Sequence, residues 1–362
     1  MDQSRFTAKG GSMVKDFHYC AVAILARAAG YPKDDANTIA YASQYTDDST
    51  ESAPIKVGEL FFDPVRTAYK GIESLSWGVQ KKVFIPFHFL PNQPLRDPSD
   101  TFRTVPNSPF ARDILKRAFG MDYSVERLCA IGIALHTFAD TWAHQKFSGR
   151  KDEENNVEKI YEFEDGKWKH PFLEGIIADL APKIGHAQAL SHPDEPYLHW
   201  RYKGRKMRGE GWTIFPRENY VIFLQAAETI YSHLVKDAQK FLAKQKPGFT
   251  AAIDWKKIET LLKKCFMFTG DLDRRMPKWY KEYQKLFRDA LSDYSRYTWR
   301  GEALLPRAQQ AKASTLTNWD KYDEGDFKRL DFPYQPGFYE SKWVLFHRAA
   351  LKQRHFVLER LL

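Results

Sequence analysis

The sequence predicts an all-α protein, and three observations support this fold class. Apolar residues recur at spacings of three and four in long segments, as at Leu128, Ile131, Leu135 and Phe138, which is typical of a helix with one face toward a core. No alternating run or hairpin turn marks a strand. No repeat of fixed period indicates a solenoid. We therefore expect one large helical domain.

The composition limits the classes of protein to consider. The 362 residues are 43% hydrophobic and 15% aromatic, which is enough for a large core and excludes a disordered chain. The net charge of +9 and the pI of about 9.2 fit an anionic partner such as a phosphate ester, nucleic acid or an acidic membrane surface, and equally a soluble basic surface. Cys20, Cys129 and Cys265 are too few and too scattered for a disulfide framework.

The N-terminal segment and the apolar stretches bear on localisation. Residues 1–12 are polar and glycine-rich, so we interpret them as a flexible leader and not as a signal peptide. The longest apolar stretches, residues 20–29 and 128–139, are shorter than the roughly 18 residues that span a bilayer. We expect no transmembrane segment, and a location in the cytoplasm or export by a route without a signal peptide.

The first helix is expected at residues 17–29, where nearly every side chain is apolar and Gly30 follows as a typical C-terminal cap. His18 lies in its first turn, and Asp16 stands just before it. His18 is either a solvent-contacting residue at a helix start or a metal ligand, with Asp16 as a cap or as the partner that orients it.

A second helix is expected from Pro32 to Asp48, because proline favours the first turn and small residues form one face. Asp47 and Asp48 end this helix, where the helix dipole disfavours acidic side chains. They therefore require a compensating cation, and Asp47 fits the packed face better than Asp48. Residues 52–108, which follow, are expected to be irregular.

A third helix, over residues 130–144, carries the clearest polar pattern. Gly132, His136, Asp140 and His144 follow one another at steps of four beside the apolar stripe, so their side chains share one face. A lone helical histidine is usually structural, but a metal ion would satisfy all three polar groups at once. Gly132 leaves a bare patch where another segment or a substrate can approach closely.

Further histidines occur in segments expected to be loops. His88 lies in a proline-bracketed extended segment, as a structural hydrogen-bonding residue or as a pocket residue. His186, His192 and Asp194 fall within nine residues of a proline-containing turn. This turn is either simply polar or supplies further ligands to the helix that carries His136.

The rest of the chain is expected to be mostly helical. Residues 151–169 are interpreted as an exposed excursion and residues 171–180 as a short helix. Residues 201–208 form a basic loop that either is solvated or holds phosphates. Four later helices are expected, at residues 220–242, 251–268, 279–297 and 343–361. We thus divide the chain into the leader 1–12, a metal-site helical domain 13–215, and a helical C-terminal half 216–362 packed on it.

The candidate metal ligands are histidines and carboxylates from separate segments, and no cysteine is among them. They are His18, Asp47, Asp48, His136, Asp140, His144, His186 and Asp194. Imidazole and carboxylate suit Zn²⁺, and also Mn²⁺ or Fe²⁺. So many ligands exceed one tetrahedral site and indicate one to three ions, of which paired ions can clamp a phosphoryl group. Asp140, with a histidine four residues to either side, is the natural bridging carboxylate, and Asp47 or Asp48 the general base.

Other catalytic templates are absent from the sequence. It contains no His-Asp dipeptide, no HExxH, no GxSxG, no GxxxxGK[ST] and no GxGxxG. A metal-free nucleophilic mechanism therefore has no supporting motif.

Several motifs carry a resemblance to known families. They are residues 16–19 (DFHY), 42–48 (ASQYTDD), 85–91 (IPFHFLP), 106–109 (PNSP), 136–145 (HTFADTWAHQ), 185–186 (GH) and 193–197 (PDEPY). Over residues 13–205 the chain resembles a family of uncharacterised bacterial proteins. More remotely, the His136–Asp140 helix resembles that of the zinc-dependent phospholipase C and P1 nuclease superfamily, which implies an all-helical fold and a zinc cluster that hydrolyses phosphoesters.

These observations lead to one functional hypothesis and two alternatives. The first is a metal-dependent hydrolase of a phosphoester, either a phospholipid or a nucleotide or nucleic acid, toward which the basic loop steers an anionic substrate. The second is a non-enzymatic helical scaffold or binding protein whose polar cluster is structural or holds a metal only for stability. The third is a bacterial effector or toxin that acts on membranes or nucleic acid.

Overall fold

The computed structural model describes residues 15–57, 60–69, 76–94, 101–170, 181–206, 211–304, 334 and 336–361. It corrects the predicted fold class. Of the described residues, 54% are helical and 13% are in strands, which form two antiparallel sheets, so the protein is mixed α/β and the all-α prediction is wrong. The expected leader 1–12 and the expected short helix 171–180 lie outside the described residues.

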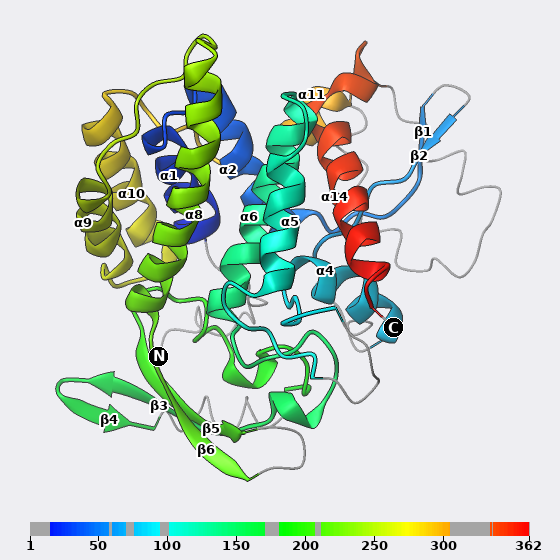
Figure 1. Ribbon diagram of the computed structural model, residues 1–362. Helices are drawn as coiled ribbons and strands as arrows, with labels where there is room; N and C mark the ends of the chain where they lie inside the picture. The colour runs from blue at the N-terminus through cyan, green and yellow to red at the C-terminus, as the bar shows by residue number, and fades with distance from the viewer. Residues whose placement is uncertain are drawn as a thin grey trace.

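The helices form the upper part of the molecule in Figure 1, around the central helix α6. Helix α6 contacts α2, α5, α8 and α14. The longer helices are η2 (Asp16–Ala21) continuing into α1 (Val22–Ala28), α2 (Lys33–Asp48), α5 (Pro109–Phe119), α6 (Val125–Ala143), α8 (Asn219–Ala243), α9 (Trp255–Phe266), α10 (Leu272–Phe287) and α14 (Lys342–Leu358). The shorter ones are α3 (Trp77–Val79), η4 (Gln80–Phe84), α4 (Ile85–Phe87), η5 (Glu153–Asn155), η6 (Ala187–Ala189), α11 (Thr298–Ala303) and η8 (Phe338–Glu340).

The buried apolar residues explain how these helices hold together. Those of η2, α1, α2, α5, α6, α8, α9, α10, α11 and α14 form one connected core, so the two expected halves of the chain share it. A smaller apolar cluster lies on the buried face of the larger sheet and includes Phe147, Trp200 and Tyr202. Within the described residues, no helix combines the length and the apolar character that crossing a bilayer would need.

The four-stranded sheet lies below the helices in Figure 1, in the order β4-β3-β5-β6. Its strands are β3 (Val157–Glu164), β4 (Lys167–Lys169), β5 (His199–Arg205) and β6 (Trp212–Glu218), and a separate hairpin joins β1 (Ile55–Val57) and β2 (Leu60–Phe62). Glu164 pairs with Lys167 across a two-residue turn in which Asp165 and Gly166 both have positive φ. Asp-Gly between strands is a standard hairpin signal, and the sequence reading overlooked it.

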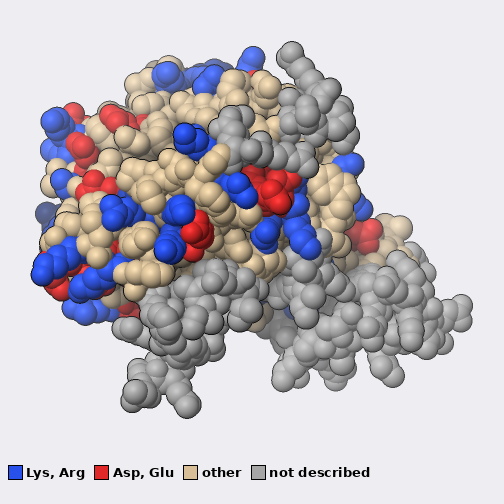
Figure 2. Space-filling model, turned by 90° about the horizontal axis from the view of Figure 1, so that it is seen from below, with Lys and Arg blue, Asp and Glu red and all other residues tan. Residues whose placement is uncertain are grey.

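Residues 201–205 of the expected basic loop are in fact part of strand β5, which corrects the sequence reading, and residues 207–208 lie outside the described residues. Its side chains alternate, with Trp200 and Tyr202 buried and Arg201, Lys203 and Arg205 on the outer face. Alternation over only seven residues, with long basic side chains on the solvent side, is the pattern of a half-buried strand. Figure 2 shows the molecule from below, where basic side chains are spread over the surface with acidic ones among them.

The segment around His88 is helical, whereas an extended conformation was expected. Helix α4 takes Pro86 in its first turn, where proline needs no hydrogen-bond partner for its nitrogen. The N–H groups of His88 and Phe89 both donate to the carbonyl of Phe84, at 2.8 Å each, and end this helical run. His88 thereby leaves the helix at its C-terminal end and faces α6.

Gly132 sets the distance between α2 and α6. A Cβ atom at this position would lie 2.4 Å from the carbonyl oxygen of Ile39 and 2.6 Å from the Cβ atom of Ala42. Real side-chain carbons do not approach so closely, so only glycine permits this contact. The expectation that another segment approaches the bare patch at Gly132 is confirmed, and that segment is α2.

Replacing Gly132 with alanine should therefore destabilise the protein. We expect Gly132→Ala to lower the free energy of unfolding by about 1–3 kcal/mol, because the backbone of α2 must move away. The matched control is Gly78→Ala in α3, where an added Cβ meets nothing within 4 Å, so its unfolding free energy should be unchanged or slightly higher. Urea unfolding of both variants measures the difference, and equal stabilities would contradict the packing argument.

His347 of α14 gives a second prediction, for the pH dependence of stability. Its side chain is 1% exposed, and its Nδ1 accepts a hydrogen bond of 2.9 Å from the N–H of Val65. Burial lowers the pKa of His347 to about 3. The unfolded chain takes up a proton near pH 6.5 that the folded protein does not, so stability falls as the pH drops below about 6.5, by roughly 1.4 kcal/mol per pH unit for this group.

In His347→Gln the amide oxygen can still accept from Val65, but the titrating group is gone. We expect the variant to lose part of the acid sensitivity of the native protein between pH 7 and pH 5. Unfolding free energies at three pH values in this range measure both slopes. Identical slopes would show that His347 does not remain neutral in the folded protein.

Candidate metal centre

Five buried side chains meet beside α6 and are called cluster A here: His18, Asp47, His88, His136 and Asp140. Asp140 is at its middle. Its Oδ1 lies 3.1 Å from His18 Nε2, and its Oδ2 lies 3.1 Å from His88 Nδ1 and 3.3 Å from His136 Nε2. Asp47 Oδ1 lies 3.6 Å from His136 Nε2 and 3.7 Å from His88 Nδ1.

A second group lies one helical turn further along α6 and is called cluster B: His144, His186 and Asp194. Asp194 Oδ1 is 3.0 Å from His144 Nε2, and Asp194 Oδ2 is 3.3 Å from His186 Nε2. All three side chains are at most 5% exposed. The two clusters are adjacent, because His144 Nδ1 lies 2.9 Å from the carbonyl oxygen of His88 and 3.7 Å from Asp140 Oδ2.

The local structure explains why these side chains converge. His136 and Asp140 are on one face of α6, and His144 is its C-terminal cap residue. Asp47 comes from the last turn of α2, which the close contact at Gly132 holds against α6. The remaining ligand candidates come from η2, from the end of α4, and from the turns around η6.

The spacing of the polar atoms suits a bound cation. Ligands about 2.0–2.1 Å from a tetrahedral zinc ion lie roughly 3.3 Å from one another. The distances within the clusters, from 3.0 to 3.7 Å, are close to this separation. Imidazole nitrogen and carboxylate oxygen together suit Zn²⁺, Mn²⁺ or Fe²⁺.

Backbone carbonyls determine which nitrogen of three histidines carries the proton. His88 Nε2 lies 2.8 Å from the carbonyl of Thr67, and His186 Nδ1 lies 2.8 Å from the carbonyl of Leu190. His144 Nδ1 faces the carbonyl of His88 in the same way. A carbonyl oxygen only accepts, so each of these nitrogens must donate. In the neutral imidazole the other nitrogen is then a lone pair directed into the cluster, which is the usual arrangement of metal-ligating histidines.

In cluster B this arrangement places acceptors opposite acceptors. The lone pairs of His144 Nε2 and His186 Nε2 both face the carboxylate of Asp194. Although burial alone lowers the pKa of His144, the carboxylates of Asp140 and Asp194 raise it to about 9, so a proton on His144 satisfies one of the two contacts. Burial and the neighbouring His144 lower the pKa of His186, so its Nε2 stays without a proton.

The contact between His186 Nε2 and Asp194 Oδ2 therefore has no proton between its two acceptor atoms. Asp194 Oδ2 is buried and has no hydrogen-bond partner within the part of the chain that the structure describes. A buried carboxylate oxygen next to a lone pair is costly. A divalent cation bound by His144 Nε2, His186 Nε2 and Asp194 would remove this cost.

Cluster A has a similar electrostatic character. Burial, with a smaller contribution from the neighbouring His18, lowers the pKa of His136 to about 3. His144 and His136 hold the pKa of Asp140 well below its usual range despite the burial that opposes this. Among the described residues, the ion pairs of Asp140 are all with histidines. A buried carboxylate thus faces imidazole nitrogens from several segments, and His136 among them stays neutral, which suits a cation.

Three of the predicted site residues lie outside both clusters. Asp16 is held by Arg275, whose Nη2 donates to Oδ2 at 3.0 Å, and by Trp279 Nε1, which donates to Oδ1 at 2.7 Å. His192 Nε2 pairs with Glu162 Oε1 at 2.7 Å and anchors its turn to the sheet.

The third is Asp48, which accepts a hydrogen bond of 2.8 Å from the hydroxyl of Tyr294. Of the two tandem aspartates, only Asp47 reaches the centre, as the packed face of its helix indicates. Asp140 does not bridge the two clusters directly, because both of its oxygens face histidines of cluster A and its contact with cluster B is through the Nδ1 side of His144.

The sequence pattern understated the role of His88 in the centre. His88 was predicted as a possible pocket residue, yet its Nδ1 lies 3.1 Å from both Asp140 Oδ2 and His136 Nε2. The local signal was weak, because nothing near His88 in the sequence shows that α4 ends against α6. Its contact with Thr67, twenty-one residues earlier, is likewise tertiary.

The fold and the two clusters define a mixed α/β protein with a buried His/Asp centre. The chain belongs to the family of unknown function DUF6765, whose model matches residues 13–361. No curated protein and no solved structure matches it. The resemblance to the phospholipase C and P1 nuclease superfamily is therefore unsupported, and the all-helical fold that it implied is wrong.

Metal analysis tests the centre directly. Protein purified without a nickel column should contain about one divalent transition-metal ion per chain or more, because cluster B supplies two lone pairs and a carboxylate. His186→Ala should lower this content, whereas His355→Ala, an exposed histidine on α14, should not. Mass spectrometry of the digested protein gives the ratio. Less than about 0.2 ion per chain, before and after incubation with zinc, would rule out the centre.

Proposed function

We propose that this protein is a metal-dependent hydrolase that acts on a phosphoester. The observation that carries the proposal is cluster B, where backbone carbonyls direct the Nε2 atoms of His144 and His186 toward one buried carboxylate. Cluster A, directly beside it, offers a second set of ligands. Neighbouring sites of this kind suit phosphoryl chemistry, where two cations share the charge of the reacting group.

Under this proposal the residues of the two clusters have separate roles. His144, His186 and Asp194 would hold one cation, and His18, His88, His136 and Asp140 would hold another. A cation at these sites acts as a Lewis acid toward a phosphoryl oxygen. Asp47 is 3.6 Å from His136 Nε2 and is either a further ligand or the general base that accepts a proton from the attacking water.

The charge of the protein supports an anionic substrate. The net charge is +9, and Arg201, Lys203 and Arg205 lie on the outer face of β5. Long-range attraction of this kind raises the rate at which a phosphate ester, nucleic acid or anionic lipid surface meets the protein. It acts before binding and does not distinguish between these substrates.

A second candidate function follows from the burial of the ligands. Each of the eight side chains in the two clusters is at most 7% exposed. A structural metal, which stabilises the fold and takes no part in a reaction, is typically closed off in this way. Under this alternative the chain is a scaffold or binding protein.

Activity measurements separate the two. With zinc or manganese present, the protein should hydrolyse p-nitrophenyl phosphate or bis-p-nitrophenyl phosphate. Asp140→Asn and His186→Ala should lower kcat/KM by roughly 100-fold or more, because each removes a ligand. His355→Ala should leave it unchanged.

The structural alternative predicts a different set of results. All variants would lack activity, the native protein included, and a chelator would lower the melting temperature of the native protein but not that of His186→Ala. Retention of full activity in Asp140→Asn would contradict the hydrolase proposal outright.

A further inference from the structure

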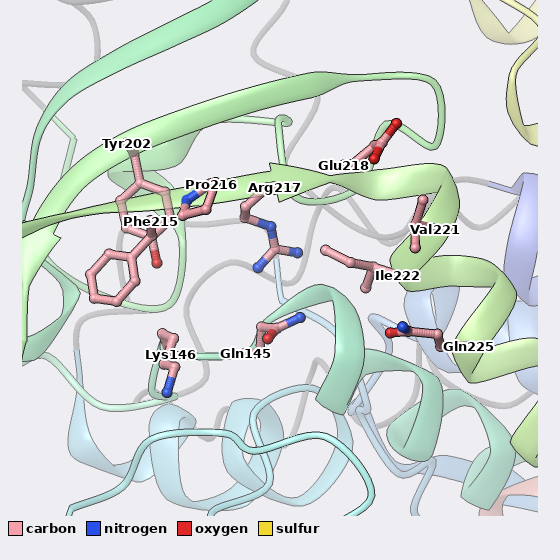
Figure 3. A pocket seen from close by; sticks show the side chains of 10 residues that line it. All are labelled: Gln145, Lys146, Tyr202, Phe215, Pro216, Arg217, Glu218, Val221, Ile222 and Gln225. Atoms are coloured by element: carbon pink, nitrogen blue, oxygen red, sulfur yellow. The ribbon is translucent and has the colours of Figure 1, made fainter.

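A pocket of about 400 Å³ lies where the end of α6 meets β6 and the start of α8. Figure 3 shows its lining, with Gln145 and Lys146 from the turn after α6, Arg217 from β6, and Gln225 from α8. The remaining wall is largely apolar and includes Phe215. None of these residues belongs to cluster A or cluster B, so the pocket is a separate site.

Arg217 is the distinctive residue of this pocket. It is only 4% exposed, and its Nη2 donates to the carbonyl of Ala143 at 2.7 Å, while the guanidinium lies 5.5 Å from the ring centroid of Trp200. Its Nε is buried without a hydrogen-bond partner, and no described Asp or Glu forms an ion pair with it. Burial lowers its pKa to about 10, so the side chain remains charged at neutral pH.

Asp194 of cluster B raises the pKa of Arg217 through its charge but forms no ion pair with it. A buried guanidinium that no described carboxylate contacts is unfavourable unless an anion compensates its charge. Arginine binds carboxylate and phosphate groups through parallel N–H donors. The existing contact with Ala143 occupies Nη2, and Nε has no acceptor among the described residues. Arg217 therefore provides the charge for an anion site in this pocket.

Lys146 adds a second cation to the same pocket. Its backbone has a φ of 75°, in the left-handed region, and its N–H donates to the carbonyl of Thr104 at 3.0 Å. This conformation is unfavourable for a residue with a Cβ atom, and such strain is often found at functional sites. The exposed ammonium on its flexible stem can reach an anion held by Arg217.

The donors and the wall together indicate the ligand. The lining offers a guanidinium, an ammonium and the carboxamide of Gln225. The carboxamide of Gln145 also lines the pocket, and its Nε2 already donates to the carbonyl of Trp142 at 3.0 Å. These donors are more than a carboxylate needs and suit the several oxygens of a phosphate group. In Figure 3 the carboxylate of Glu218 points away from Arg217. This carboxylate accepts a hydrogen bond from the hydroxyl of Tyr220.

We propose that this pocket binds a phosphate group, from inorganic phosphate or from a phosphate ester whose organic part lies against the apolar wall. The site does not depend on metal in cluster A or cluster B. It is nevertheless close to them in the chain, because Ala143, which Arg217 contacts, directly precedes His144.

Calorimetric titration of the full-length protein with inorganic phosphate and with phenyl phosphate tests the proposal. Lys146→Ala should weaken binding of both about tenfold, because it removes a charge-assisted contact. Arg217→Gln should weaken it at least as much. Lys244→Ala, the matched loss of an exposed lysine at the end of α8, should have no effect, and neither should His186→Ala. Tighter binding of phenyl phosphate identifies an ester as the ligand, and equal affinity identifies inorganic phosphate.

Three results would overturn the proposal. The first is the absence of millimolar or tighter phosphate binding by the native protein. The second is an equal effect of Lys146→Ala and Lys244→Ala. The third is binding that is lost in His186→Ala and retained in Lys146→Ala. The last pattern would assign the phosphate to the metal centre. Because the lysine variants change only exposed side chains, the test does not depend on whether Arg217→Gln folds.

Discussion

The close contact between α2 and α6 is the constraint on which the rest of this structure depends. At Gly132 the two helices approach so closely that a single added carbon would meet the backbone of Ile39. This contact brings Asp47, at the end of α2, to within 3.6 Å of His136 on α6. With a larger residue at 132 the helices would separate and Asp47 would no longer face the histidines. Packing inside the core thus sets the geometry of the polar centre.

The centre also shows how a protein keeps several carboxylates in a buried position. Asp140 and Asp194 are each 1% exposed, and their described ion pairs are with histidines. Backbone carbonyls hold the rings of His144 and His186 so that their lone pairs point inward. Protons can satisfy only part of this arrangement, since the pKa of His186 is lowered. Because protons leave part of the negative charge of these carboxylates unbalanced, the centre suits a bound cation.

The arginines outside the centre differ from one another in how their charge is compensated. On β5 the arginines lie over exposed or half-buried aromatic rings, as Arg201 does over Trp168 at 4.2 Å, and remain in contact with water. Arg217 on the neighbouring strand is buried and its guanidinium faces a pocket. The same residue type therefore serves as a solvated surface charge in one position and as an anion site in the other. Burial and the available partners decide between these roles.

The sequence by itself determined the helices with long apolar stripes and the spacing of His136, Asp140 and His144, because both follow from the period of an α-helix. It also carried the signals for the strands, in Asp165-Gly166 and in the alternation of β5, although these short patterns were read as loops. The packed face of α2 already favoured Asp47 over Asp48, but only the tertiary structure decided that His88 reaches the centre while Asp16 and His192 do not. The physical reason is that these residues meet through packing between distant segments, which no local pattern encodes.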